Sequence, residues 1–187
     1  MVTVPSLPSL GAGALVSSAQ LSQIASVADF LCQGKPLAMT RASTTQSLTA
    51  GSRTTITFGT KVFDNDGMFN SGQTTRLTVQ TNGWYNISYS IPISGSGQTT
   101  TDGGAFITTG SNNPSGSGVV EACWGGMNGN INPGTTYHTV HAIGVIPFYM
   151  YAGDWATIQI DAPTGSTNVT DASTDFWAFM CLEWVGA

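Results

Sequence analysis

The sequence predicts a mainly β protein: an antiparallel two-sheet sandwich preceded by an extended arm and one short α-helix. After Pro36 the chain is rich in β-branched and aromatic residues, and turn residues recur about every ten positions. Two segments also alternate cleanly between apolar and polar side chains. With 187 residues and 41% hydrophobic content, we expect one domain with an N-terminal appendage.

Residues 1–34 are predicted to form the arm and the helix. Prolines and glycines in residues 1–16 favour an extended arm. In residues 17–32 apolar side chains recur at helical spacing, Ser17 or Ser18 can cap the start, and the helix is expected to end near Gly34. A helix this short is marginal alone in water, so its apolar stripe must be buried on the domain, on sister chains or on another protein. We interpret the stripe as an anchor formed by Leu21, Ile24, Ala28 and Leu31.

Residues 84–93 form the clearest predicted strand. The core face is expected to carry Tyr85, Ile87, Tyr89, Ile91 and Ile93, while the residues between them face water. Residues 155–161 repeat the pattern and are expected to lie in the same sheet, with Ala156, Ile158 and Ile160 inside.

The closing segment, residues 176–185, is apolar on both faces. One face carries Phe176, Met180, Leu182 and Trp184, and the other carries Trp177, Phe179 and Cys181. In a two-sheet sandwich only one face of a strand meets the core, so we expect a neighbouring subunit to cover the second face. The alternative is that the helix of residues 17–32 covers it within one chain.

Residues 135–151 are also long and largely apolar, and we expect them to lie beside the last strand. His138 and His141 are three residues apart, which puts them on opposite faces of a strand, so they cannot share a metal there. We expect both histidines in the subunit interface or a polar network.

Composition excludes several classes of function. Only 8% of residues are charged, and the five Lys and Arg are spread along the chain, so nucleic-acid binding is not expected. We find no pattern typical of a signal peptide or a membrane span, and expect a product that stays soluble in a cytoplasm. Cys32, Cys123 and Cys181 lack metal or disulfide spacing and are interpreted as packed thiols.

Motifs that could support chemistry are weak. Asp64, Asp66 and Gly67 resemble the start of a calcium loop, but the downstream glutamate is missing, so we predict a tight turn. No nucleophile motif, phosphate-binding loop or close pair of acids is evident. We expect no enzymatic activity, no cofactor and no metal.

A glycine- and asparagine-rich segment at residues 123–130 is the best candidate for a ligand-binding loop. Its candidate ligand contacts are Trp124, Asn128 and Asn130, because a tryptophan in such a loop can stack on a sugar ring. The alternative is that Trp124 is part of the core or of an interface.

One stretch of the sequence resembles a known family. Residues 56–93 read ITFGTKVFDNDGMFNSGQTTRLTVQTNGWYNISYSIPI, with strands at 56–58 and 76–79, a turn at 63–69 and Gly83-Trp84-Tyr85 before the longest strand. Residues 151–155, YAGDW, and the closing aromatic strand fit the same pattern. In order and spacing this resembles the C1q- and TNF-like jelly roll, in particular the versions found in structural proteins of tailed bacteriophages. The resemblance covers residues 35–187, and residues 11–31 also resemble the segment that precedes such domains in phages.

The resemblance implies a homotrimer formed through the sheet that carries the first and last strands. It also implies a virion structural protein, assembled in the host cytoplasm and attached to other virion proteins of the tail through residues 1–34. The alternatives are a capsid decoration protein that stabilises the head, or a receptor-binding module that contacts host-surface glycan.

Overall fold

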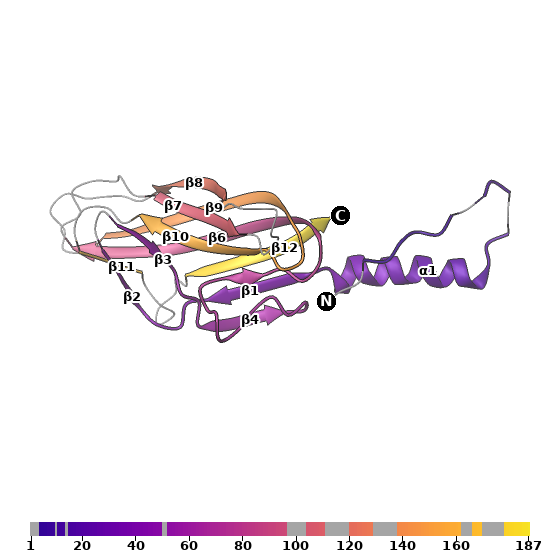
Figure 1. Cartoon of the computed structure of the whole chain (residues 1–187), viewed down its shortest axis with the longest axis horizontal. Helices are drawn as coiled ribbons and strands as arrows, with labels where there is room; N and C mark the ends of the chain where they lie inside the picture. The colour runs from indigo at the N-terminus through magenta and orange to yellow at the C-terminus, as the bar shows by residue number, and fades with distance from the viewer. Residues whose placement is uncertain are drawn as a thin grey trace.

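The chain forms an elongated body of β-strands with a helix that projects from one end (Figure 1). The computed structural model describes residues 4–9, 11–13, 15–49, 52–96, 104–110, 120–128, 138–161, 166–169 and 178–187. The elements are α1 (Ser18–Asp29), the π-helical turn η1 (Phe30–Gly34), β1 (Leu37–Arg41), β2 (Gln46–Leu48), β3 (Arg53–Thr55), β4 (Thr60–Asp64), β5 (Leu77–Thr78), β6 (Gly83–Ser96), β7 (Gly104–Gly110), β8 (Val120–Asn128), β9 (His138–Met150), β10 (Trp155–Asp161), β11 (Ser166–Val169) and β12 (Phe179–Gly186).

The strands form two antiparallel sheets. In sheet A the order is β4-β1-β12-β6-β9, and β11 pairs with the far end of β6 and with β2. In sheet B, β10 pairs with β7 on one side and with β3 and β5 on the other, and β7 pairs with β8. The last residues of β8, Met127 and Asn128, pair with β9 and so join the two sheets. The predicted mainly β, two-sheet jelly roll with one short helix is confirmed.

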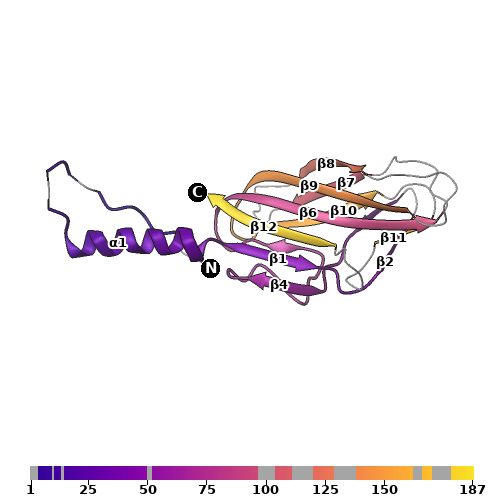
Figure 2. The same cartoon turned by 180° about the vertical axis from the view of Figure 1, so that it is seen from behind.

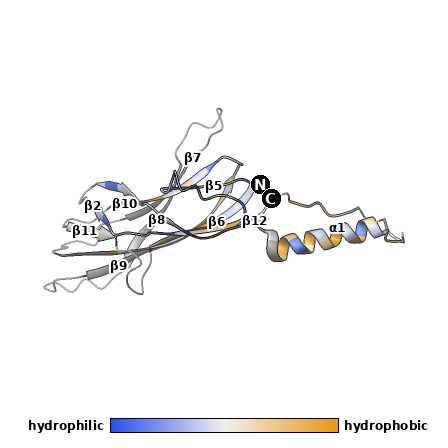
Figure 3. Cartoon of the chain, turned by 90° about the horizontal axis from the view of Figure 1, so that it is seen from below, coloured by the Kyte–Doolittle hydropathy of each residue, from blue (hydrophilic) through white to orange (hydrophobic). Residues whose placement is uncertain are grey.

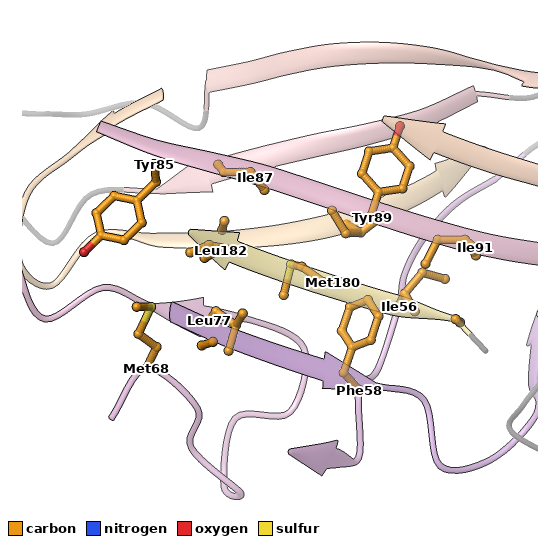
Figure 4. Close-up of a cluster of buried hydrophobic side chains, with 14 of the residues drawn as sticks. Ile56, Phe58, Met68, Leu77, Tyr85, Ile87, Tyr89, Ile91, Met180 and Leu182 are labelled. Carbon is orange, nitrogen blue, oxygen red and sulfur yellow. The ribbon is translucent and has the colours of Figure 1, made fainter. Parts of the chain in front are cut away.

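The core lies between the sheets and is built by alternation along the strands. All five apolar residues predicted to face inward from β6 are buried, and β12 adds Met180 and Leu182 (Figure 4). From sheet B and the connecting segments come Ile56, Phe58 and Ile158, which are also buried. The core prediction for β6 is therefore confirmed, because period-two alternation matches the pleat of a strand with one buried face.

The predicted location of β10 is wrong. Ala156, Ile158 and Ile160 are buried as expected, but β10 belongs to sheet B and β6 to sheet A. Alternation identifies the buried face of a strand, and both sheets of a sandwich bury one face, so the pattern does not choose between them.

The predicted neighbour of residues 135–151 is also wrong. The pairing partner of β9 is β6 over the whole of its length, from His138–Gly95 to Met150–Gly83, and β6 separates β9 from β12. An apolar segment has to be buried, but its composition does not name the strand that lies beside it.

The predicted helix is confirmed, including its capping residue. Ser17 is the N-cap, its hydroxyl accepts a hydrogen bond from the Gln20 N–H, and the Gln20 side chain accepts one from the Ser17 N–H at 2.9 Å. This is a capping box, which satisfies two otherwise unpaired donors at the start of α1. None of the side chains of α1 is buried, and Cys32 in η1 is exposed, so the interpretation of Cys32 as a packed thiol is wrong.

The motif with Asp64 forms a turn, as predicted. The Asp64 carboxylate accepts hydrogen bonds from the N–H groups of Met68 at 3.0 Å and Phe69 at 2.9 Å, and the Asp66 N–H lies 3.2 Å from the same group. Gly67 has a φ of 72°, a left-handed conformation that suits glycine. The Asp64 oxygens are thus occupied in closing the segment after β4.

Candidate subunit interface

The outer face of sheet A is the candidate functional site. Along β12 the buried residues Met180, Leu182 and Trp184 alternate with Phe179, Cys181 and Glu183, which are only half-buried. The second set therefore lies on the face directed away from the core. This face agrees with the sequence prediction for Phe179 and Cys181, while Trp177 lies outside the described residues.

A row of cross-strand neighbours crosses this face through five strands. The pairs Phe63–Met39, Met39–Cys181, Cys181–Ser88 and Ser88–Val145 join β4, β1, β12, β6 and β9 in turn. Four of these five side chains are apolar or weakly polar. Phe63 and Val145 are 39% and 63% exposed in the single chain, so the row leaves large apolar side chains in contact with solvent.

A second apolar group lies at the end of the sheet from which α1 projects. Trp84, on β6, is 46% exposed and meets the Tyr149 ring edge to face at 5.6 Å. Tyr149 in turn meets Tyr151 at 5.2 Å. Exposed Val185 on β12 lies at the same end. The outer positions Glu183, Asn86 and Pro147 lie between these rings and the row. The row and the aromatic group are hereafter together called the sheet A face.

The sheet A face also carries charge. Arg41 of β1 lies opposite Phe179, on the same outer side of the sheet as Met39 and Cys181. Glu183 forms an ion pair with Lys35 at 3.5 Å, and both side chains are partly exposed. The Cys181 thiol is half-buried, and burial raises its pKa, with a smaller rise from Glu183 and an opposing hydrogen bond from Ser88. The thiol therefore stays protonated at neutral pH and acts as a small apolar group.

The two predicted histidines do not share this face. In β9, His141 pairs with Pro92 and His138 pairs with Gly95, positions of opposite parity in the ladder. By alternation along β9, position 141 is on the same outer side of the sheet as Val145, whereas position 138 is on the inward side. Both belong to sheet A, but at most one of them falls on the candidate interface.

The alternative in which the helix covers this face is wrong. Both broad views show α1 extending away from the strands along the long axis of the molecule (Figures 1 and 2). Its anchor residues Leu21, Ile24, Ala28 and Leu31 are all exposed. The contact that attaches the helix is at its base, where the Phe30 and Trp184 rings lie 5.2 Å apart, edge to face.

The predicted ligand loop around Trp124 is wrong as a loop. Trp124 lies within β8 and pairs with Phe106 of β7, and Asn128 pairs with His141 of β9. Asn130 lies outside the described residues. In this segment, glycine and asparagine hide the alternation of apolar and polar residues that marks a strand. Because both residues are uncommon in strands, the composition favoured a loop. Glycan contact stays a prediction without a described site.

Sequence reasoning did not predict that Trp84, Tyr149, Val145, Phe63 and Met39 lie on the sheet A face. The signal for Trp84 was available, since a tryptophan at a water-facing position of a strand is itself unusual. Phe63 was assigned to a turn. Met39 and Val145 each join the row only through pairings between strands that are distant in sequence.

The sheet A face offers exposed apolar side chains and few reactive groups. Among the described residues, no group of three His, Cys, Asp or Glu side chains is placed to hold a metal ion. Nor does any helix in the described part of the chain have the length and apolar character needed to cross a membrane. That the chain lacks enzymatic activity stays a prediction.

Comparison with known proteins identifies the fold. No protein-family model matches the sequence, and no curated protein matches it either. Solved structures do match: murine APRIL at pH 5.0 has a TM-score of 0.54 and 12% identity, over 81% of this chain and 99% of that chain. Murine APRIL at pH 8.5 has a TM-score of 0.52 and 12% identity, over 80% of this chain and 98% of that chain.

The globular domain of zebrafish complement 1qA is also similar, with a TM-score of 0.48 and 15% identity over 81% of this chain and 97% of that chain. The identities are low, so the likeness concerns the arrangement of strands alone. On the evidence of the APRIL structures, the chain has the C1q/TNF-like jelly-roll fold.

Proposed function

We propose that three copies of this chain assemble through the sheet A face into a trimeric knob, which residues 1–34 attach to a tailed-phage virion. The observation that supports the assembly is the row Phe63–Met39–Cys181–Ser88–Val145, which leaves apolar side chains exposed across five strands of one sheet. Only 8% of the residues are charged, so few charged side chains are available to keep such an apolar surface soluble in the single chain.

The sheet itself supports a trimer as the form of assembly. It contains β1 and β12, the first and last long strands of the domain, and the jelly-roll resemblance implies threefold contacts through that sheet. The virion location is supported by the resemblance of residues 11–31 and 56–93 to phage structural proteins. The tail is preferred to the capsid, on the pattern of residues 11–31.

Sedimentation of the full chain and of two variants tests the assembly. Val145→Asp places a charge on the sheet A face at a side chain that is 63% exposed, so the monomer's core is not altered. Leu7→Asp is the matched control, because Leu7 is an aliphatic residue of the arm that is 72% exposed and is not part of the sheet A face.

At micromolar concentration we expect the wild type and Leu7→Asp to sediment as three 19.4 kDa chains, and Val145→Asp as one chain with an unchanged circular dichroism spectrum. A monomeric wild type contradicts the assembly. Antibody labelling of purified particles tests the location: we expect label at the tail, and unlabelled particles contradict the virion role.

A further inference from the structure

The apolar stripe of α1 has the spacing of a coiled-coil seam. Leu21, Ile24 and Ala28 follow one another at steps of three and four residues, the a, d and a positions of a heptad repeat, and Leu31 follows in the π-helical turn η1. In the single chain Leu21 is 58% exposed, Ile24 38% and Leu31 53%. The helix alternates between apolar and polar segments along its length (Figure 3). Such a narrow seam fits another helix better than it fits a sheet.

The chain's own arm does not occupy this seam. The Gln20 side chain donates a hydrogen bond to the Ser9 carbonyl at 3.0 Å, which places the arm on the flank of α1 that carries Gln20. Val27, one heptad later, lies on the same flank, and these two are the half-buried residues of α1. The arm therefore lies beside the seam and leaves it open.

The composition of α1 suits packing against the α1 helix of another copy of the chain. Asp29 is the single charged residue between Ser18 and Asp29, so the helix offers no charge complement to an acidic or basic partner. The flanking positions Ser18 and Ala25 are small, and Ala28 lies within the seam. Small residues allow identical helices to approach closely without like charges facing one another.

The base of α1 is held against the strand at the centre of the sheet A face. Phe30 packs on Trp184 of β12, and the Trp184 N–H donates to the Pro36 carbonyl at 2.9 Å. Lys35 pairs with Glu183 of the same strand. Copies that meet through sheet A therefore bring the bases of their helices to one end of the assembly, from which α1 projects (Figure 1).

We infer that the α1 helices of three copies pack against one another through Leu21, Ile24 and Ala28, followed by Leu31 of η1, as a short parallel three-helix stalk. This rests on the proposed trimer, because two heptads are too short to associate alone, whereas the jelly rolls hold the helices at high effective concentration. The stalk buries the anchor stripe within the trimer and leaves the arm, residues 1–16, for contact with the virion.

Hydrogen exchange of the full chain, read by mass spectrometry on peptides that span α1, tests the stalk. Ile24→Glu places three carboxylates in one layer of the seam, and Ser26→Glu places the same side chain on the opposite face of the helix as a matched control. The Val145→Asp variant, which we expect to be monomeric, gives the exchange rate of α1 in the single chain. Sedimentation of every sample reports the assembly separately.

We expect α1 amides to exchange at least ~10-fold more slowly in wild type and Ser26→Glu than in the Val145→Asp monomer. In Ile24→Glu we expect fast exchange in chains that still sediment as trimers. A wild-type trimer whose α1 exchanges as fast as the monomer overturns the stalk and leaves the trimer standing. Slow exchange that Ile24→Glu does not change also overturns the stalk, and a monomeric wild type overturns both proposals.

Discussion

Tyr85 links the start of β6 to the turn after β4 through buried polar groups. Its hydroxyl donates to the Thr81 carbonyl at 2.7 Å, and the Thr81 hydroxyl donates to the Asp66 carboxylate at 3.0 Å. Burial raises the pKa of Tyr85, the nearby Asp66 charge raises it further, and the hydrogen bond to Thr81 opposes the rise. The folded chain therefore keeps the Tyr85 proton under conditions in which an unfolded chain releases it.

The stability of the protein should fall in alkaline solution because of Tyr85. An unfolded tyrosine has a pKa of about 10, so the contribution is complete below about pH 10 and declines above it, where the unfolded state binds fewer protons than the folded state. Urea unfolding between about pH 8 and pH 11 measures this slope.

Tyr85→Phe is the matched variant for this measurement. It loses a buried hydrogen bond, so we expect lower stability by about 1 kcal/mol at neutral pH, but a shallower decline above pH 10. Parallel curves for the wild type and Tyr85→Phe would show that another group causes the alkaline loss.

At the scale of elements, β6, β10 and α1 show which structural features the spacing of apolar residues predicts and which it does not. The buried residues of β6 and β10 and the capping residue of α1 follow from local spacing alone, since each depends on the geometry of one strand or one helix end. The sheet of β10 and the neighbour of β9 do not, because pairing joins residues far apart in the chain. At Trp124 the local composition itself misled the prediction, because β8 is rich in glycine, as loops are, but pairs with β7 as a strand.

The turn that follows β4 should depend on the Asp64 carboxylate. Asp64→Ala removes the acceptor of the Met68 and Phe69 N–H groups, which are partly buried, so we expect a loss of about 1–3 kcal/mol in the free energy of unfolding. Asn70→Ala is the control, because Asn70 accepts one exposed hydrogen bond, from Gly72, and should cost less than about 1 kcal/mol. Chemical denaturation of both variants measures the difference, and equal losses would contradict this role of Asp64.

At the scale of the whole molecule, the decisive feature is that the single chain leaves large apolar side chains exposed on two surfaces. The core takes one face of sheet A, while the other face keeps Val145 and Trp84 exposed, and α1 keeps its own stripe exposed. The helix that carries this stripe projects from one end of the strands (Figure 2). In the proposed trimer, both surfaces would be covered by neighbouring copies.

Thermal stability should therefore depend on protein concentration. For a trimer that dissociates as it unfolds, mass action raises the Tm by about 2–3 °C for each tenfold increase in concentration of a chain this size. We expect this rise for the wild type in scanning calorimetry and its absence for Val145→Asp. A wild-type Tm that does not change with concentration would mean that folding and assembly are not coupled.

By itself the sequence determined that the fold is mainly β, which face of β6 is buried, where α1 begins, and that β12 has two apolar faces. Each of these depends on periodicity or composition within a few neighbouring residues. Only the tertiary structure decided that β6 lies between β9 and β12, that Phe63, Met39 and Val145 join Cys181 in one row, and that α1 leaves that row uncovered. The reason is physical: a surface made by pairing five strands is a property of long-range contacts, which no local pattern encodes.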